Sequence, residues 1–190
     1  LNSKTYQLSS ETNEGNRADV AQFSHYPMKR LGAEQLLDAL CQVTATTETF
    51  ASRIPEPYTR LPARYRASQI ADGNVESAIL DLFGRPPRDT PYERERACEM
   101  TMRQALYFVN SDHLEGKVSS SARIKRMLDE KKPDAEIIEE FFLAALSRLP
   151  TAKEKERLAD HLARNKNNRA QAVRDLVWAI LNTNEFTFNH

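Results

Sequence analysis

The chain has 190 residues, of which 40% are hydrophobic and 28% are charged, and its mean hydropathy is −0.64. This composition is typical of a soluble globular protein and excludes a chain that is disordered by its own charge. No apolar run approaches the roughly 20 residues that a membrane-spanning helix needs. The 27 basic residues equal the 27 acidic ones, so the chain lacks the excess positive charge that favours nucleic-acid binding.

The first 74 residues predict a loop-rich segment with one helix. Residues 1–30 are polar and rich in turn formers, and the apolar residues from Ala33 to Thr44 then recur at helical spacing. Cys41 falls on the apolar face of that helix, as a small core residue. Three prolines break the periodicity, so residues 53–74 predict a long irregular connection. We expect residues 1–74 to pack on the rest of the chain or on a further domain upstream.

Residues 75–190 predict a helical domain. A short helix that begins near Val75 should end at Gly84 in the left-handed conformation, because prolines follow at once. Two more helices follow, and Ser121 is placed to cap the second. In the first helix the apolar stripe is defined by Met102, Ala105, Leu106 and Val109 and is widened by Tyr107 and Phe108. In the second helix Ile124, Met127 and Leu128 are expected to face the core.

A compact three-helix unit closes the chain. Its first helix carries a broad apolar stripe from Ile137 to Leu149, with acidic residues at the positive end of the helix dipole. Thr151 and Glu154 have the spacing of a capping box that starts the second helix, and residues 173–181 predict the third. With only five glycines and little support for strands, the chain predicts an all-α fold, an irregular multi-helix bundle with long loops.

Reactive residues are few and scattered. The four histidines stand at least 29 residues apart, and no nucleophile elbow or glycine-rich phosphate loop occurs. Cys41 and Cys98 are too few for a disulfide framework, and whether they pair stays open. We therefore expect no metal and no cofactor. The Cys-x-x-Cys-His haem motif is absent as well, which predicts a chain without covalent haem.

In the stretch LFGRPPRDTPYERERA, residues 82–97, charged residues gather around three prolines. We favour a solvated connection between helices, because its opposite charges neutralise one another. The competing interpretation is an active site, in which carboxylates act as acid and base and guanidinium groups hold an anionic substrate. Its candidate catalytic residues are Asp89, Glu93 and Glu95 with His25 or His113, and its candidate binding residues are Arg85, Arg88, Arg94 and Arg96.

Several stretches carry a resemblance to a known family: TYQLSSETNEGNRAD, HYPMKRLGAEQLLDALCQVT, LDLFGRPPRDT, QALYFVNSD, EIIEEFFLAALSRLPTAKEKERL and DLVWAILNTNEFTFNH. Together they resemble the C-terminal domain of unknown function found in large planctomycete proteins, often with an upstream cytochrome-c-like module and a second uncharacterised domain. Many relatives have a Cys-Glu-Cys-Glu-Arg run where this chain has Tyr92 and Arg94 in the two cysteine positions. The resemblance implies an exported, periplasmic or cell-envelope multidomain protein, linked to polysaccharide breakdown.

Two functions follow as hypotheses. The first is a non-catalytic helical scaffold or interaction module, whose partners are the upstream domains of the same polypeptide. The alternative is a carbohydrate-active hydrolase or lyase that uses the acids and arginines of residues 85–96. We expect no nucleic-acid partner, and polysaccharide remains a candidate ligand. An apolar patch on the surface would support the first hypothesis.

Overall fold

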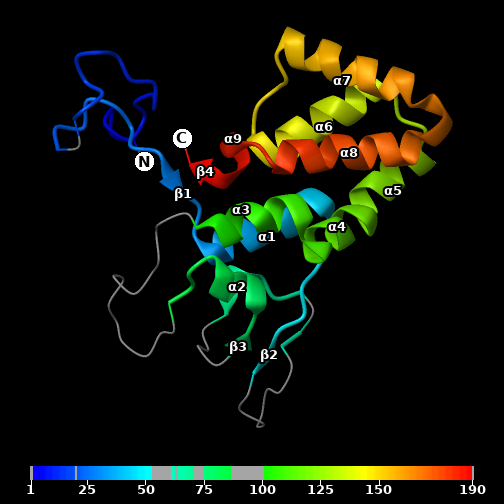
Figure 1. The fold of residues 1–190 in the computed structure, drawn as a ribbon, viewed down its shortest axis with the longest axis horizontal. Helices are drawn as coiled ribbons and strands as arrows, with labels where there is room; N and C mark the ends of the chain where they lie inside the picture. Colours follow the sequence, from blue (N-terminus) through cyan, green and yellow to red (C-terminus); the bar gives the residue numbers. More distant parts are fainter. Residues whose placement is uncertain are drawn as a thin grey trace.

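The computed structural model describes residues 2–19, 21–52, 61–62, 64–70, 75–86 and 101–189 (Figure 1). Helices account for most of them and confirm the predicted all-α, multi-helix fold with long loops. The α-helices are α1 (Ala33–Thr44), α2 (Ala78–Leu82), α3 (Met102–Asn110), α4 (Asp112–Ser119), α5 (Ala122–Asp129), α6 (Asp134–Leu146), α7 (Ala152–Arg164), α8 (Arg169–Leu181) and α9 (Asn184–Thr187). Single 3₁₀ turns occur at η1 (Ala67–Gln69) and η3 (Lys166–Asn168).

Short antiparallel strand pairs tie distant parts of the chain together. Strand β1 (Lys29–Arg30) pairs with β4 (Phe188–Asn189), which brings the start of the helical body next to its end. Strand β2 (Ala51–Ser52) pairs with β3 (Val75–Glu76). Each strand has two residues, so the pairs close loops rather than build a layer.

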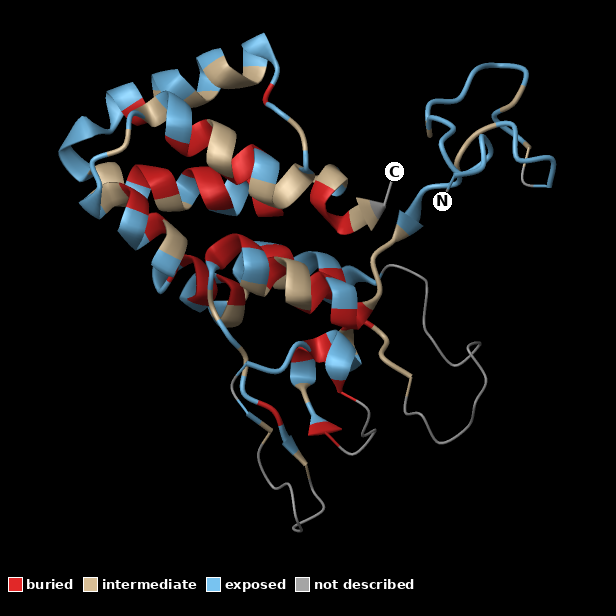
Figure 2. Cartoon of the chain, turned by 180° about the vertical axis from the view of Figure 1, so that it is seen from behind, coloured by how far each residue is buried: buried red, intermediate tan, exposed pale blue. Residues whose placement is uncertain are grey.

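A single set of buried side chains joins α1 to the C-terminal helices. Helix α1 buries Leu36, Leu37 and Leu40, and it contacts α2, α4, α5 and α6. Figure 2 shows the buried faces of α1, α6 and α8 turned toward one another. Burial of a leucine side chain stabilises a fold by about 2 kcal/mol. The leucines of α1 therefore fix this helix, and the segments on either side of it, against the C-terminal helices.

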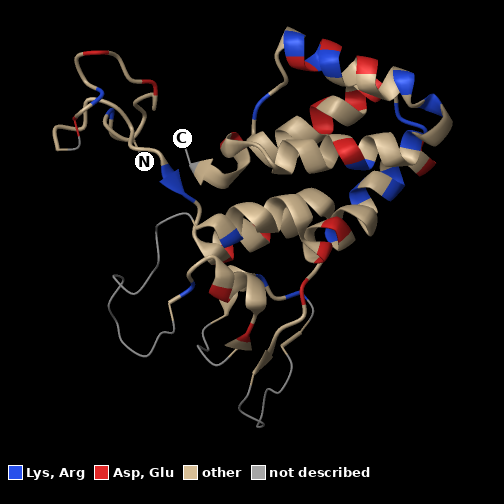
Figure 3. Cartoon of the chain, viewed as in Figure 1, with Lys and Arg blue, Asp and Glu red and all other residues tan. Residues whose placement is uncertain are grey.

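The predicted C-terminal three-helix unit consists of α6, α7 and α8. Thr151 accepts a hydrogen bond from the Glu154 amide while the Glu154 carboxylate accepts one from the Thr151 amide, so the predicted capping box starts α7. The Arg148 guanidinium donates to Glu154 at 2.9 Å and also to Glu185 at the start of α9. Figure 3 shows that α7 carries many charged residues, in contrast to α3, where Arg103 is the single charge.

The prediction for the buried face of α3 is wrong for the residues that define its stripe. Their side chains are exposed, by 80% for Met102, 49% for Leu106 and 54% for Val109. Gln104 faces the core, together with Phe108 from the edge of the predicted stripe. The Gln104 side chain donates to the Leu82 carbonyl and accepts from Arg30 and the Thr101 amide, so its burial leaves no polar group unsatisfied. Leu149, expected on the buried stripe of α6, is 58% exposed as well.

The N-terminal residues up to Met28 lie apart from the helical bundle in both views (Figures 1 and 2). Their turns are held by side chains that bond to the backbone. The Asp19 carboxylate accepts hydrogen bonds from the amides of Ala21, Gln22 and Ser24. Hydrogen bonding, first of all from Ser24, holds the pKa of Asp19 well below its usual value. This segment is ordered locally rather than by burial in the core.

Candidate functional site

A group of polar side chains lies between the end of α1 and the start of α4, and we call it the Glu48 cluster: Cys41, Glu48, Tyr107, His113 and Lys117. His113 and Lys117 are four residues apart and so share one face of α4. The Lys117 ammonium lies 2.8 Å from a Glu48 carboxylate oxygen and donates to the Cys41 sulfur at 3.2 Å. The same Glu48 oxygen lies 2.5 Å from His113 Nε2.

The hydrogen bonds link the members of the Glu48 cluster in a chain. An ionised carboxylate only accepts, so His113 donates to Glu48 from Nε2, and its Nδ1 shares a hydrogen bond of 2.6 Å with the Tyr107 hydroxyl. Burial alone would raise the pKa of Glu48, but hydrogen bonds from His113 and Lys117, and the charge of Lys117, outweigh it and lower that pKa from 4.5 to about 2. Burial raises the pKa of the Tyr107 hydroxyl, and the charge of Glu48 adds to that effect. The cluster is therefore a protonated tyrosine, a histidine bonded through both ring nitrogens, and the ion pair of Glu48 with Lys117.

Cys41 has the surroundings of a structural thiol. Burial raises its pKa, and the neighbouring Lys117 lowers it only in part. The thiolate is the nucleophilic form of cysteine, and a raised pKa keeps the protonated form at neutral pH. Both ring nitrogens of His113 are already engaged in hydrogen bonds, so this histidine is not placed as a base for Cys41.

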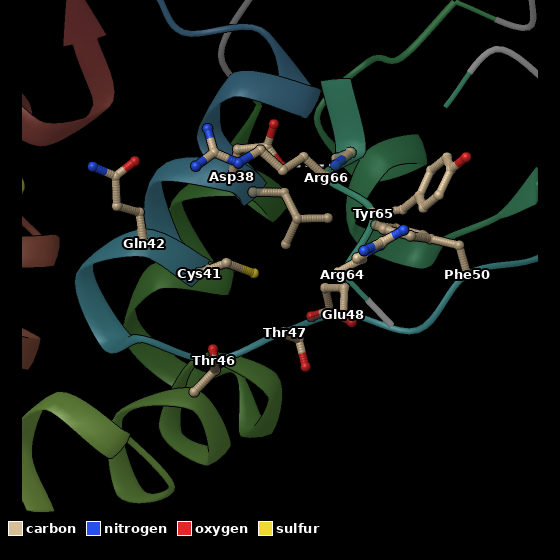
Figure 4. Close-up of a pocket in the computed structure, with 12 residues that line it drawn as sticks. Asp38, Cys41, Gln42, Thr46, Thr47, Glu48, Phe50, Arg64, Tyr65 and Arg66 are labelled. Atoms are coloured by element: carbon tan, nitrogen blue, oxygen red, sulfur yellow. Dashed lines mark hydrogen bonds between the residues drawn. The ribbon is translucent and has the colours of Figure 1, made fainter. Parts of the chain in front are cut away.

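A pocket of about 170 Å³ opens beside the Glu48 cluster (Figure 4). We call it the Cys41 pocket. It lies between α1, the chain after α1, and the segment that leads into η1. Its polar lining residues are Asp38, Cys41, Gln42, Thr46, Thr47, Glu48, Arg64, Tyr65 and Arg66.

The second candidate surface is the outward face of α3, which we call the α3 stripe: Met102, Ala105, Leu106 and Val109. Their spacing of three and four residues places them on one side of the helix, and all four are exposed. A hollow of about 470 Å³ lies next to this stripe, between the end of α3, α4 and α8. Val109 and Trp178 line it, and Trp178 is 39% exposed. An apolar helix face thus borders a hollow that contains a tryptophan.

The structure brings together few of the residues predicted for an active site. Asp89, Glu93 and Glu95, and with them Arg88, Arg94 and Arg96, lie outside the described residues. Arg85 lies within them, and its guanidinium donates to the Val75 carbonyl and the Asp81 carboxylate, with only 7% of the side chain exposed. It therefore ties α2 to β3 instead of facing a ligand.

The two candidate histidines are far apart in the fold. His25 belongs to the N-terminal segment, which lies apart from α4 in Figure 1. His25 Nδ1 is buried and has no hydrogen-bond partner among the described residues, whereas His113 belongs to the Glu48 cluster. The sequence reasoning missed Glu48 and Lys117. The His113–Lys117 spacing was the one visible sign of a shared face.

The described residues contain no group of three or more histidine, cysteine or acidic side chains that could hold a metal ion. None of the helices in that part of the chain is long and apolar enough to span a bilayer.

Residues 1–162 match the model of PSD1, a protein family described as being of unknown function (DUF1553). The chain belongs to this family. The match confirms the resemblance to a domain of unknown function, and the PSD1 region covers every residue of the Glu48 cluster and of the α3 stripe. No curated protein and no solved structure matches the chain.

Proposed function

We propose that this chain is a non-catalytic helical interaction module of an exported multidomain protein, linked to polysaccharide breakdown, and that the α3 stripe docks on a neighbouring domain of the same polypeptide. The observation that carries the proposal is the orientation of α3. An amphipathic helix normally turns its apolar side chains to the core, and here the side with Met102, Leu106 and Val109 is exposed while Gln104 is buried beside Phe108. Contiguous exposed apolar surface marks sites of protein contact.

The extent of the stripe favours a linked domain as the occupant. Helix α3 has nine residues and is therefore about 13 Å long. A stable interface between separate proteins buries about 800 Å² on each partner, which is more than four side chains supply. A domain in the same polypeptide is present at an effective concentration in the millimolar range, so a smaller interface holds it. Trp178 beside the hollow is the kind of aromatic residue that anchors such contacts.

The Glu48 cluster supports a structural rather than a catalytic role for the polar interior. Its tyrosine, histidine, lysine and carboxylate satisfy one another, and its cysteine is held protonated. The hydrolase or lyase alternative stays a prediction, because six of its loop residues lie outside the described part of the chain. Within that part, Arg85 is engaged in the fold and no observation favours this alternative.

Calorimetry of the full-length gene product and of the isolated chain tests the proposal. Docking stabilises the native state by mass action, so we expect a higher Tm for this domain in the full-length protein. The double variant Leu106→Ser, Val109→Ser should bring that Tm down to the value for the isolated chain. The same substitutions should have little effect on the isolated chain, where these side chains already lie in water.

Leu143→Ser is the matched control, because Leu143 has the same 49% exposure as Leu106 but lies on α6. It should leave the difference between full-length protein and isolated chain unchanged. Equal melting of the domain in both contexts would contradict docking through α3.

A further inference from the structure

The Cys41 pocket is lined by acidic and basic side chains, and the two kinds differ in their contacts within the protein. Both carboxylates accept hydrogen bonds from neighbouring residues. Glu48 accepts from His113 and Lys117. Asp38 accepts from the amides of Ala67 and Ser68, and from the Ser68 hydroxyl at 2.6 Å. These acids hold the walls of the pocket together.

Among the described residues, the two arginines that line the pocket have no acidic partner. Neither the Arg64 nor the Arg66 guanidinium forms an ion pair with any described residue, and both residues are exposed. Figure 4 shows their side chains at the pocket together with Cys41 and Glu48. A guanidinium group carries five N–H donors and no acceptor. What the pocket lacks is therefore an acceptor with negative charge.

From this difference we infer that the Cys41 pocket binds a small oxyanion, a carboxylate or a sulfate group, between Arg64 and Arg66. The planar fork of a guanidinium matches the paired oxygens of both groups and holds them bidentately. Lys117, behind Cys41, neutralises Glu48 on the inner side of the pocket, so that carboxylate repels an anion less. The inference is independent of docking through α3, because the two surfaces share no residue.

The size of the pocket limits the ligand. Its volume of about 170 Å³ corresponds to roughly five or six water molecules at about 30 Å³ each. That space holds one oxyanion with the small body that carries it, such as a single acidic sugar. A free inorganic anion and an anion carried on a sugar present the same oxygens, so the experiment has to separate them.

Isothermal titration calorimetry with sodium sulfate and with sodium glucuronate, each against sodium chloride at equal ionic strength, separates the two sources. We expect heat of binding beyond that of chloride for at least one probe. Binding by sulfate alone assigns the pocket to free anions, and tighter binding of glucuronate assigns it to acids carried on a sugar. Arg64→Gln and Arg66→Gln should each weaken binding about tenfold, the effect of losing one charge-assisted hydrogen bond.

Arg164→Gln on α7 is the matched control, because its side chain is 81% exposed and lies away from the pocket. It should leave binding unchanged. A second measurement is the rate at which iodoacetamide alkylates Cys41, read by peptide mass spectrometry, which the bound probe should slow. Binding no stronger than that of chloride for both probes, or equal binding by the two pocket variants and the wild type, would overturn the inference.

Discussion

Replacing Lys117 by methionine tests the energetics of the Glu48 cluster. The Lys117 side chain is 6% exposed and that of Glu48 is 22% exposed, so methionine leaves a largely buried carboxylate without its cation. The difference between the Glu48 pKa of about 2 in the fold and its ordinary value of 4.5 corresponds to about 3 kcal/mol of stability at neutral pH. Hydrogen bonding from His113 supplies part of this stability, so we expect Lys117→Met to lower the free energy of unfolding by about 2 kcal/mol.

The stability lost in Lys117→Met should itself depend on pH, and it should become smaller in acid. Because folding lowers the pKa of Glu48, its contribution is complete above about pH 4.5 and is lost as the pH falls toward 2. Urea unfolding followed by circular dichroism should therefore show a gap between wild type and Lys117→Met that is roughly halved at pH 3 relative to pH 7. A double-mutant cycle with Glu48→Gln should give a coupling energy of about 1 kcal/mol or more.

Lys155→Met is the control for this substitution. Lys155 is 45% exposed and pairs with Glu139 on the surface, so its loss should cost less than about 1 kcal/mol. The reasoning fails if Lys117→Met costs no more than Lys155→Met at pH 7, or if its cost is the same at pH 3 and pH 7.

Two local predictions concern the backbone and one helix cap. Gly84→Ala should lower the free energy of unfolding by about 1 kcal/mol, because Gly84 has a φ of 80°, which an alanine adopts only with strain. Gly116→Ala should raise the free energy of unfolding by up to about 1 kcal/mol, because an added Cβ there has free space within α4. Thermal unfolding of both variants checks the opposite signs, and two shifts of the same sign would contradict this. Thr151→Ala should lower the free energy of unfolding by about 1 kcal/mol, because it removes the capping box of α7. Urea unfolding measures this loss, and Thr101→Ala, which removes the corresponding cap of the shorter α3, is the comparison. Unchanged stability of the Thr151 variant would count against that cap.

Features set by a few neighbouring residues could be predicted from the sequence. Ser121 accepts from the Ile124 amide at the start of α5, the Thr151–Glu154 box starts α7, and Gly84 adopts the left-handed conformation, as expected. Each depends on the chemistry of one turn, which the order of residues determines. The broad stripes of α6 and α8 could be predicted for a related reason, because one dominant apolar face leaves a single way to bury it.

Which face of α3 meets the core could not be predicted in this way. Its sequence has apolar residues on two sides, Met102 with Leu106 and Val109 on one and Tyr107 with Phe108 on the other. Periodicity identifies the faces but not which one meets the core. Contacts from elsewhere in the chain decide it: the Phe83 ring packs against the Tyr107 and Phe108 rings, with centroids 5.3 and 5.7 Å away.

The contacts within the Glu48 cluster could not be predicted from the sequence either. Lys117 meets Glu48 across 69 positions and Cys41 across 76, and no spacing rule links residues that far apart. His113 was a candidate because of its residue type, and its acidic partner, Glu48, lies 65 positions away in the sequence. Long-range pairs of this kind depend on how helices pack, which only the folded chain shows.

Thiol labelling of Leu106→Cys tests the proposed docking most directly, by comparing this chain alone with the proposed longer polypeptide. Leu143→Cys is the comparison site, because Leu143 has the same exposure as Leu106 but lies on α6. Mass spectrometry reads each site separately from Cys41 and Cys98. If α3 docks on a neighbouring domain, the thiol at position 106 should react quickly in the isolated chain and at least tenfold more slowly in the full-length protein, while position 143 reacts equally in both. Equal rates at position 106 in the two proteins would contradict the interaction module.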